Sequence, residues 1–196
     1  MNIWRERFSR WFTPLARCCP LSPNAITVLA LLINVLAAAL LQQRHFLIAM
    51  AVLIVGGLAD AFDGIVARVQ EKTSKFGDFL DHFADRVSDT LLLTGWLLGN
   101  AVRIEIALTA VISILLNGYI GTQLEATWHE REYESVGRGE FVLALVVFPI
   151  VSHILFANGW DAQTAAGLRI AEWMSLLLTA GAVLGIGQRL ALARRL

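Results

Sequence analysis

Long apolar stretches constrain the fold of this chain more than any other feature. Several of them approach or exceed the roughly 20 residues that a helix needs to cross a bilayer, and residues 46–59 carry no charge. Charged residues make up only 16% of the sequence, against roughly 25% in soluble domains. The sequence therefore predicts an all-α integral membrane protein. Its net charge of zero gives no reason to expect a nucleic-acid partner.

Six membrane-spanning helices are expected. The connections QQRH, GNAVR and NGWDAQ are short, and the loops near 70–75 and 126–139 are polar and charged. The expected spans lie near 24–41, 46–69, 76–98, 102–125, 140–157 and 164–188.

The N-terminal residues 1–19 are predicted to form an amphipathic surface helix. Aromatic residues share one helical face, with arginines among them: Trp4, Phe8, Trp11 and Phe12, with Arg5, Arg7 and Arg10. A helix of this pattern is typical of the membrane–water interface. The six-helix membrane domain then covers residues 20–196, and Asn24 is the expected N-cap of its first helix.

The placement of Lys and Arg predicts the orientation, because cytoplasmic segments are enriched in these residues. With the N-terminus in the cytoplasm, the inside segments carry twelve of the 16 Lys and Arg residues, Arg189 near the C-terminus among them. The outside segments carry Arg44, Arg103 and Arg169. We therefore expect a protein of the cytoplasmic (inner) membrane with both termini in the cytoplasm.

Six aspartates fall between positions 60 and 89, in the second and third expected spans. Asp60 and Asp63 are three residues apart and Asp81 and Asp85 are four apart, so each pair occupies one face of its helix. An antiparallel hairpin around the loop at 70–75 brings the four carboxylates to matching depths. At about 1.5 Å per residue in a core about 30 Å thick, Asp60 lies roughly 9 Å below the cytoplasmic surface.

Carboxylates at such a depth need a counter-charge. A charged side chain well inside a bilayer costs about 2.5–3.5 kcal/mol, and neighbouring carboxylates also repel one another. Mg²⁺ or Mn²⁺ offsets both effects, because these cations prefer oxygen ligands. The sequence therefore predicts a divalent-cation site that is recessed in the membrane and open to the cytosol.

The residues around the aspartates suit a ligand that carries phosphate. Gly64 and Ala67 leave the helix face bare beside Asp60 and Asp63, and Arg68 can bind a phosphate bidentately. Ser74 and Lys75 precede the third span, where a helix N-terminus favours an anionic group.

This pattern of aspartates, glycines and arginine resembles the CDP-alcohol phosphatidyltransferase family. DAFDGIVAR, an eight-residue spacer and GDFLDHFAD match the family signature D-x-x-D-G-x-x-A-R followed by G-x-x-x-D-x-x-x-D. The six-span layout with an N-terminal surface helix is also similar, so the resemblance covers nearly the whole chain. All specified positions of the signature are present: Asp60, Asp63, Gly64, Ala67, Arg68, Gly77, Asp81 and Asp85.

The resemblance implies a phospholipid-synthesising transferase with two divalent ions, Mg²⁺ or Mn²⁺. Such an enzyme moves a phosphoalcohol group from a CDP-linked donor to the hydroxyl of a second alcohol and releases CMP. The implied metal ligands are Asp60, Asp63, Asp81 and Asp85, and Asp85 is also the implied general base. The nucleotide site then comprises Asp60, Gly64, Ala67, Arg68 and Gly77, with Ser74 beside them.

The expected donor is a CDP-diacylglycerol-type lipid, and the expected acceptor is a small polar alcohol. Lys75 and Arg138 are candidate phosphate or acceptor contacts, and Arg138 resembles the basic position of inositol-phosphate-type members. The stretch GYIGTQLEATWHERE, from the second half of the fourth span into the loop after it, carries no Lys or Arg before Arg131, however. This absence argues against a phosphorylated acceptor.

Other functions account for the pattern less completely. Within the family, a choline- or ethanolamine-type phosphotransferase with diacylglycerol as acceptor is the alternative. A divalent-cation transporter needs polar residues through the full depth of the membrane, whereas the outer halves of these spans are nearly all apolar. An intramembrane aspartyl protease explains neither Gly64 nor Arg68.

A homodimer is expected, partly from the resemblance and partly from small residues in the spans that permit close helix contact: Gly95, Gly99, Gly118 and Gly121. Of the remaining carboxylates, Asp89 is expected to pack near the site beside Arg86. Asp78 is a helix-start charge, which the helix dipole favours.

Overall fold

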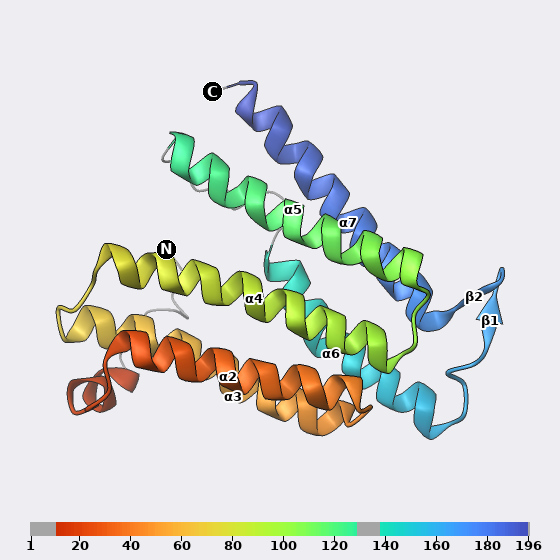
Figure 1. Cartoon of the computed structure of the whole chain (residues 1–196), viewed down its shortest axis with the longest axis horizontal. Coiled ribbons are helices and arrows are strands. Elements are labelled where there is room, and N and C mark those ends of the chain that lie inside the picture. The colour runs from red at the N-terminus through yellow and green to blue at the C-terminus, as the bar shows by residue number, and fades with distance from the viewer. Residues whose placement is uncertain (1–10, 129–137, 196) are drawn as a thin grey trace.

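The computed structural model describes residues 11–128 and 138–195, and these residues are almost entirely helical (Figure 1). A short helical segment covers residues 11–17. The long helices are α2 (Pro23–Gln42), α3 (Phe46–Val69), α4 (Lys75–Gly99), α5 (Ile104–Trp128), α6 (Arg138–Ala157) and α7 (Ile170–Ala193).

These helices agree with the six expected spans to within a few residues, except at the start of the last one. Five of them are long and apolar enough to cross a membrane, and α4 is the exception among the six. Its first half carries the carboxylates of the signature, which lower its hydropathy.

The last span was predicted to begin at 164, and this prediction is wrong. Residues 164–169 form a hairpin of β1 (Thr164–Ala165) and β2 (Leu168–Arg169), so the described chain is not purely helical. Ala166 and Gly167 between the strands both have positive φ, which is the conformation of a tight two-residue hairpin turn. Helix α7 follows from Ile170.

Serine residues cap the starts of α2 and α4. Ser22 is the N-cap of α2 and accepts a hydrogen bond from the backbone N–H of Ala25 at 3.3 Å. Asn24, the predicted cap, lies inside the helix instead, because Pro23 takes the first helical position, where its missing N–H costs nothing. Ser74 caps α4 in the same way and accepts from the N–H of Gly77 at 3.0 Å.

Helices α2, α3 and α4 pack side by side, and α2 makes the most extensive contacts with both of the others (Figure 1). Helix α6 packs against α3, while α5 and α7 run together at an incline to the first three helices. The core lies between these groups around Trp96, whose ring is 5.1 Å from Phe148 and whose indole N–H donates to Ser152 Oγ at 2.9 Å. The loop between α3 and α4 and the β-hairpin lie at opposite ends of the molecule.

Glycines allow several of these helices to approach closely. A Cβ at Gly95 or Gly99 would collide with the backbone carbonyl of Ala38 or Leu41 on α2. On α5, Gly118 and Gly121 face the guanidinium groups of Arg86 and Arg189. The four glycines that suggested a dimer contact therefore all face neighbouring segments of their own chain, and they give no support for a dimer.

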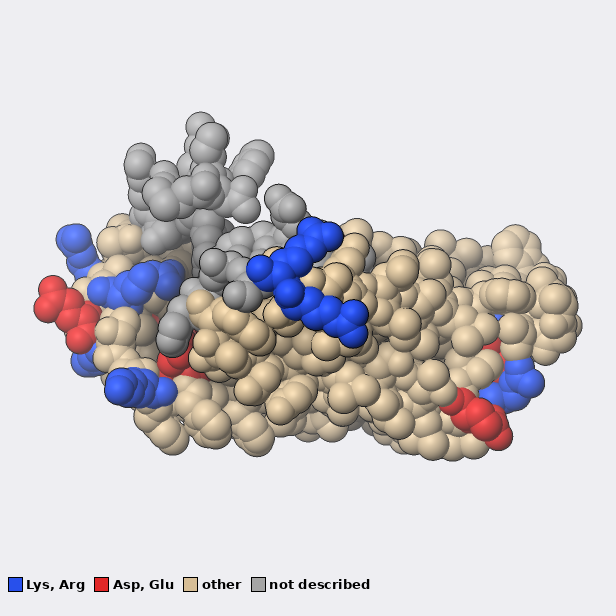
Figure 2. All heavy atoms as spheres, turned by 90° about the horizontal axis from the view of Figure 1, so that it is seen from above, with Lys and Arg blue, Asp and Glu red and all other residues tan. Residues whose placement is uncertain are grey.

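Charged side chains mark the two ends of the molecule. On the face in Figure 2, red and blue atoms gather at both ends of the long axis, and the described residues that show between them are tan except for one blue cluster. Large apolar side chains such as Leu32, Ile48 and Leu177 are exposed on the helices. This distribution is typical of a protein whose middle contacts lipid.

Candidate active site

Helices α3 and α4 bring three of the predicted carboxylates together. Asp60, Asp63 and Asp81 each offer a ligand oxygen, and these oxygens all lie within 4.8 Å of one another. The hairpin around the α3–α4 loop produces this meeting, as the spacing of the aspartates predicts. Asp85 lies one turn further along α4, is only 7% exposed, and stands outside this group of three.

A threonine from α2 fixes one of these carboxylates. Thr27 Oγ1 lies 2.5 Å from Asp63 Oδ2 and 3.1 Å from the backbone oxygen of Pro23, and both Thr27 and Asp63 are buried. The hydroxyl group therefore holds one carboxylate oxygen of Asp63 and leaves the other available to a ligand. Thr27 could not be identified from the sequence, because it lies 36 residues before Asp63 in an apolar stretch that carries no motif.

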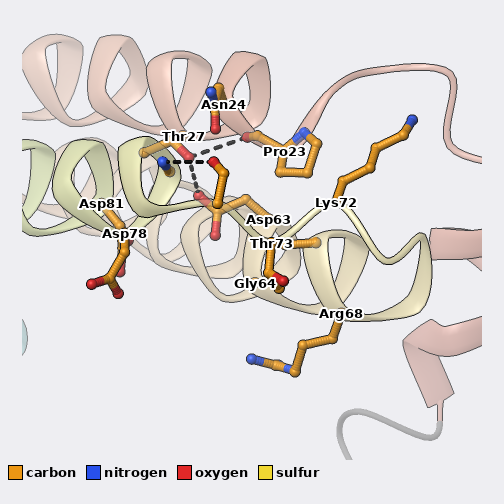
Figure 3. Close-up of a pocket in the computed structure, with 13 residues that line it drawn as sticks. Pro23, Asn24, Thr27, Asp63, Gly64, Arg68, Lys72, Thr73, Asp78 and Asp81 are labelled. Atoms are coloured by element: carbon orange, nitrogen blue, oxygen red, sulfur yellow. Dashed lines mark hydrogen bonds between the residues drawn. The ribbon is translucent and has the colours of Figure 1, made fainter.

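A cavity of about 200 Å³ adjoins the carboxylates (Figure 3). Its walls come from the start of α2, the end of α3, the α3–α4 loop and the start of α4. The lining residues are Pro23, Asn24, Thr27, Asp63, Gly64, Ala67, Arg68, Lys72, Thr73, Ser74, Gly77, Asp78 and Asp81.

Most of the predicted nucleotide site lines this cavity. Gly64, Ala67, Arg68, Ser74 and Gly77 all contribute to it, and this agrees with the arrangement that the sequence led us to expect.

The structure separates other predicted residues from the cavity. Asp60 joins the carboxylate group but is not part of the cavity wall, and Lys75 begins α4 outside it. Lys72 and Thr73, which the sequence did not single out, take part instead. The side chain of Arg138 lies outside the described part of the chain.

The signature glycines lie where a side chain would narrow the cavity. A Cβ at Gly64 would lie 3.4 Å from Arg68 Nη1. A Cβ at Gly77 would lie 3.2 Å from both Asn24 Oδ1 and Ser74 Oγ, which is a tight contact. The glycines therefore keep the cavity open beside the Arg68 guanidinium and at the contact between α2 and α4.

Opposite charges lie on different sides of the cavity. Figure 3 shows Asp78 and Asp81 on one side, with Arg68 and Lys72 away from them. A close group of carboxylates is the ligand type that hard divalent cations prefer. A cation there and the Arg68 guanidinium could bind two parts of one diphosphate. The chemistry of the residues present thus fits a divalent ion together with an anionic ligand.

A second polar region lies along α4 and α5, further from the α3–α4 loop than the carboxylate group. Arg86 Nη2 lies 3.3 Å from Asp89 Oδ2, so the expected pairing of these two residues is confirmed. Arg189 was assigned to the cytoplasmic tail, and this assignment is wrong because α7 continues past it. The Arg189 side chain is buried, and its Nη1 donates to the backbone oxygen of Asn117 at 3.1 Å.

The family model described as CDP-alcohol phosphatidyltransferase matches residues 20–185. The chain therefore belongs to the CDP-alcohol phosphatidyltransferase family, as its signature residues indicated. It is an enzyme that transfers a group from a CDP-linked donor to an alcohol, and the transporter and protease alternatives are set aside.

Two relatives are named archaetidylinositol phosphate synthase. The protein from Pyrococcus horikoshii is 37% identical over 99 residues, and the match covers 50% of this chain and 53% of that protein, about half of each. The protein from Methanothermobacter thermautotrophicus is 26% identical over 162 residues, 83% of each chain.

The fold is also similar to that of phosphatidylinositol phosphate synthase from Mycobacterium tuberculosis. Its crystal structure with CDP-DAG bound matches with a TM-score of 0.72 at 24% identity, over 93% of this chain and 92% of that chain. The structure of that enzyme with manganese and citrate matches with a TM-score of 0.72 at 23% identity, over 91% and 87%. The likeness shows a common fold, and the expected divalent cofactor agrees with the carboxylate group described above.

Proposed function

We propose that this enzyme transfers a phosphatidyl group from a CDP-diacylglycerol-type lipid to the hydroxyl of a small polar alcohol, with release of CMP. The observation that carries the proposal is the group of Asp60, Asp63 and Asp81, with ligand oxygens within 4.8 Å of one another, beside a cavity that Arg68 borders. A related fold was crystallised with CDP-DAG. The donor assignment follows from these two findings together.

The metal site is proposed to hold two divalent ions, Mg²⁺ or Mn²⁺, on Asp60, Asp63, Asp81 and Asp85. When bound, such a pair neutralises charge on a diphosphate and stabilises the attacking and leaving oxygens of a displacement. Thr27 orients Asp63 for this role through its hydroxyl group. Gly64 and Gly77 keep room for the nucleotide, and Arg68 pairs with its phosphate.

Asp85 is proposed as the general base. Its position one turn beyond Asp81 on α4 separates it from the other three carboxylates while keeping it near them. In the reaction, the acceptor oxygen forms a bond to the phosphorus of the phosphatidyl group, and the bond from that phosphorus to CMP breaks. The hydroxyl proton passes to a carboxylate oxygen of Asp85.

The acceptor is proposed to be a phosphorylated inositol, contrary to what the sequence of α5 suggested. The relatives named above are archaetidylinositol phosphate and phosphatidylinositol phosphate synthases. Helix α5 has no basic residue of its own, but α7 places the guanidinium of Arg189 against it beside Gly121. In this proposal, Arg189 of α7 supplies the positive charge for the phosphate of the acceptor, and Arg138 is a further candidate for that role.

The placement in the membrane is part of the proposal. We propose that α4 is the sixth span, that residues 11–17 belong to a surface helix, and that the cavity opens to the cytoplasm. Trp11 is 85% exposed and Leu15 is 60% exposed, whereas Ala16 is fully buried against the rest of the chain. This asymmetry supports a surface helix with one face toward lipid. A homodimer is proposed from family resemblance alone.

A substrate panel tests the function. Purified enzyme receives radiolabelled CDP-diacylglycerol with Mn²⁺ and, in turn, inositol phosphate, inositol, glycerol phosphate and serine, and released CMP and lipid product are measured. Parallel reactions contain CDP-choline or CDP-ethanolamine as the donor and diacylglycerol as the acceptor. Product with inositol phosphate alone supports the full proposal. Product only from CDP-choline or CDP-ethanolamine with diacylglycerol would reverse donor and acceptor. Absence of CMP release from every donor would refute the proposed reaction.

A further inference from the structure

The end of α3 is connected to the N-terminal segment by one side chain, that of Gln70. Its Nε2 donates to the backbone oxygens of Ala16 and Cys19, both at 2.9 Å. Its Oε1 accepts from Lys72 Nζ at 2.7 Å. A glutamine amide has two N–H groups and one carbonyl oxygen, so every polar group of this side chain has a partner. Gln70 thus connects the N-terminal segment to a residue of the cavity wall.

Apolar packing fixes the N-terminal segment at the same place. Ala16 is completely buried in a cluster with Ile65 and Val66 of α3. Phe12 also makes an edge-on contact with Phe62 of α3, with ring centroids 6.0 Å apart. The carbonyls that Gln70 binds therefore belong to a docked segment.

The backbone after Gln70 is also restrained. Gln70 is the C-cap of α3, and the N–H of Lys72 donates to the oxygen of Ala67 at 2.8 Å. Glu71 between them has a φ of 56°. Helix α3 therefore ends in a Schellman motif, with Glu71 as its left-handed residue and the bond from Lys72 to Ala67 as its 6→1 hydrogen bond. Ser74 then caps α4. The loop is thus held at both ends, and the bond to Gln70 restrains the side chain of Lys72 as well.

We propose that Gln70 is a positioning residue: it connects the N-terminal segment to Lys72 and so holds the lysine charge at the outer rim of the cavity that binds the CDP-linked donor. This inference rests on the proposed function, in which that cavity binds the donor. A lysine ammonium attracts a polyanion through its charge. The restraint keeps that charge near the mouth of the cavity, on a different side from Asp78 and Asp81 (Figure 3).

Two substitutions separate the two sets of hydrogen bonds that Gln70 makes, those to the Ala16 and Cys19 carbonyls and the one from Lys72. Gln70→Glu keeps an acceptor for Lys72 but loses both N–H groups that bind Ala16 and Cys19. Gln70→Lys keeps donors for those carbonyls but loses the acceptor and repels Lys72. Gln70→Leu removes both sets of hydrogen bonds. The matched control is Gln43→Leu, because Gln43 is the C-cap of α2 at the other end of the membrane domain.

The first readout needs no substrate. The chain has two lysines, Lys72 and Lys75, and their acylation by a succinimidyl ester can be followed separately by mass spectrometry. Gln70→Leu and Gln70→Lys are expected to raise the acylation rate of Lys72 several-fold while that of Lys75 stays unchanged. If the acylation rate of Lys72 is the same in wild type, Gln70→Leu and Gln70→Lys, and thermal unfolding shows that the variants are folded, Gln70 does not restrain Lys72.

The second readout is steady-state kinetics with CDP-diacylglycerol. Gln70→Leu is expected to raise KM for the donor about 3- to 10-fold with kcat within about twofold, which corresponds to loss of one ordinary, exposed hydrogen bond. In a Lys72→Met background the same substitution should have no further effect, because the two residues act as one unit. Additive effects, or a fall in kcat with KM unchanged, would overturn the positioning role. If wild type releases no CMP from any donor, the proposed function fails, and the acylation rates still decide whether Gln70 restrains Lys72.

Discussion

Thr27→Val tests the most specific contact in the site. Valine has nearly the shape of threonine, so the substitution removes the hydroxyl group that lies 2.5 Å from Asp63 Oδ2 and changes little else. Both residues are buried and meet open space only where they line the cavity. A hydrogen bond to a charged group is worth about 1.5–3 kcal/mol, which corresponds to roughly 10- to 150-fold in an equilibrium constant.

The assay is the Mn²⁺ concentration that gives half-maximal CMP release. Losing a partner that orients a metal ligand typically weakens metal affinity by about 10- to 100-fold, and we expect a rise within that range, with kcat at saturating Mn²⁺ within a few-fold of wild type. Thr179→Val is the matched control, because Thr179 Oγ1 donates to the oxygen of Ser175 in α7, within its own helix. An unchanged metal requirement in a folded Thr27→Val protein would refute the role assigned to Thr27.

Three further substitutions test other parts of the account. Asp85→Asn should lower kcat by about 10²- to 10⁴-fold, as loss of a general base does, while equilibrium binding of the donor stays within a few-fold; turnover close to wild type would assign the base to another group. Glu172→Gln should lower the free energy of unfolding by about 1–3 kcal/mol, because buried Glu172 accepts from Arg103 Nε and from the N–H of Arg169; an unchanged melting temperature would contradict this. Gly95→Ala should also destabilise the protein, by about 1–3 kcal/mol from overpacking against the carbonyl of Ala38; a loss of stability that disappears on dilution to monomer would instead indicate a contact between two chains.

The part of the site that lies within one helical hairpin could be predicted from the sequence. Asp60, Asp63 and Asp81 meet as their spacing predicts, because helical periodicity and the short α3–α4 loop determine both their face and their depth. Gly64, Arg68 and Gly77 line the cavity for the same reason. The positions of the long helices were also predictable, since the apolar stretches have the lengths that a bilayer requires.

Contributions from distant helices could not be predicted in this way. Thr27 and Asn24 reach the site from α2, and an ordinary threonine or asparagine at a helix start gives no sign of such a contact. Arg189 looks like part of a basic tail in the sequence, yet α7 extends far enough to bury it against Asn117. Gly95 and Gly99 indicate close helix contact, but only the fold shows that the contact is with α2 of the same chain.

The most direct test of the account is CMP release from CDP-diacylglycerol and inositol phosphate as a function of divalent metal. Wild-type enzyme is treated with EDTA, dialysed and titrated with Mn²⁺ or Mg²⁺, beside Asp63→Asn and Asp81→Asn. We predict no release after EDTA, full recovery on adding either metal to wild type, and no recovery in the two variants at the same metal concentration. Full activity after removal of the metal, or wild-type recovery in both variants, would contradict the claim that these carboxylates hold the catalytic metal.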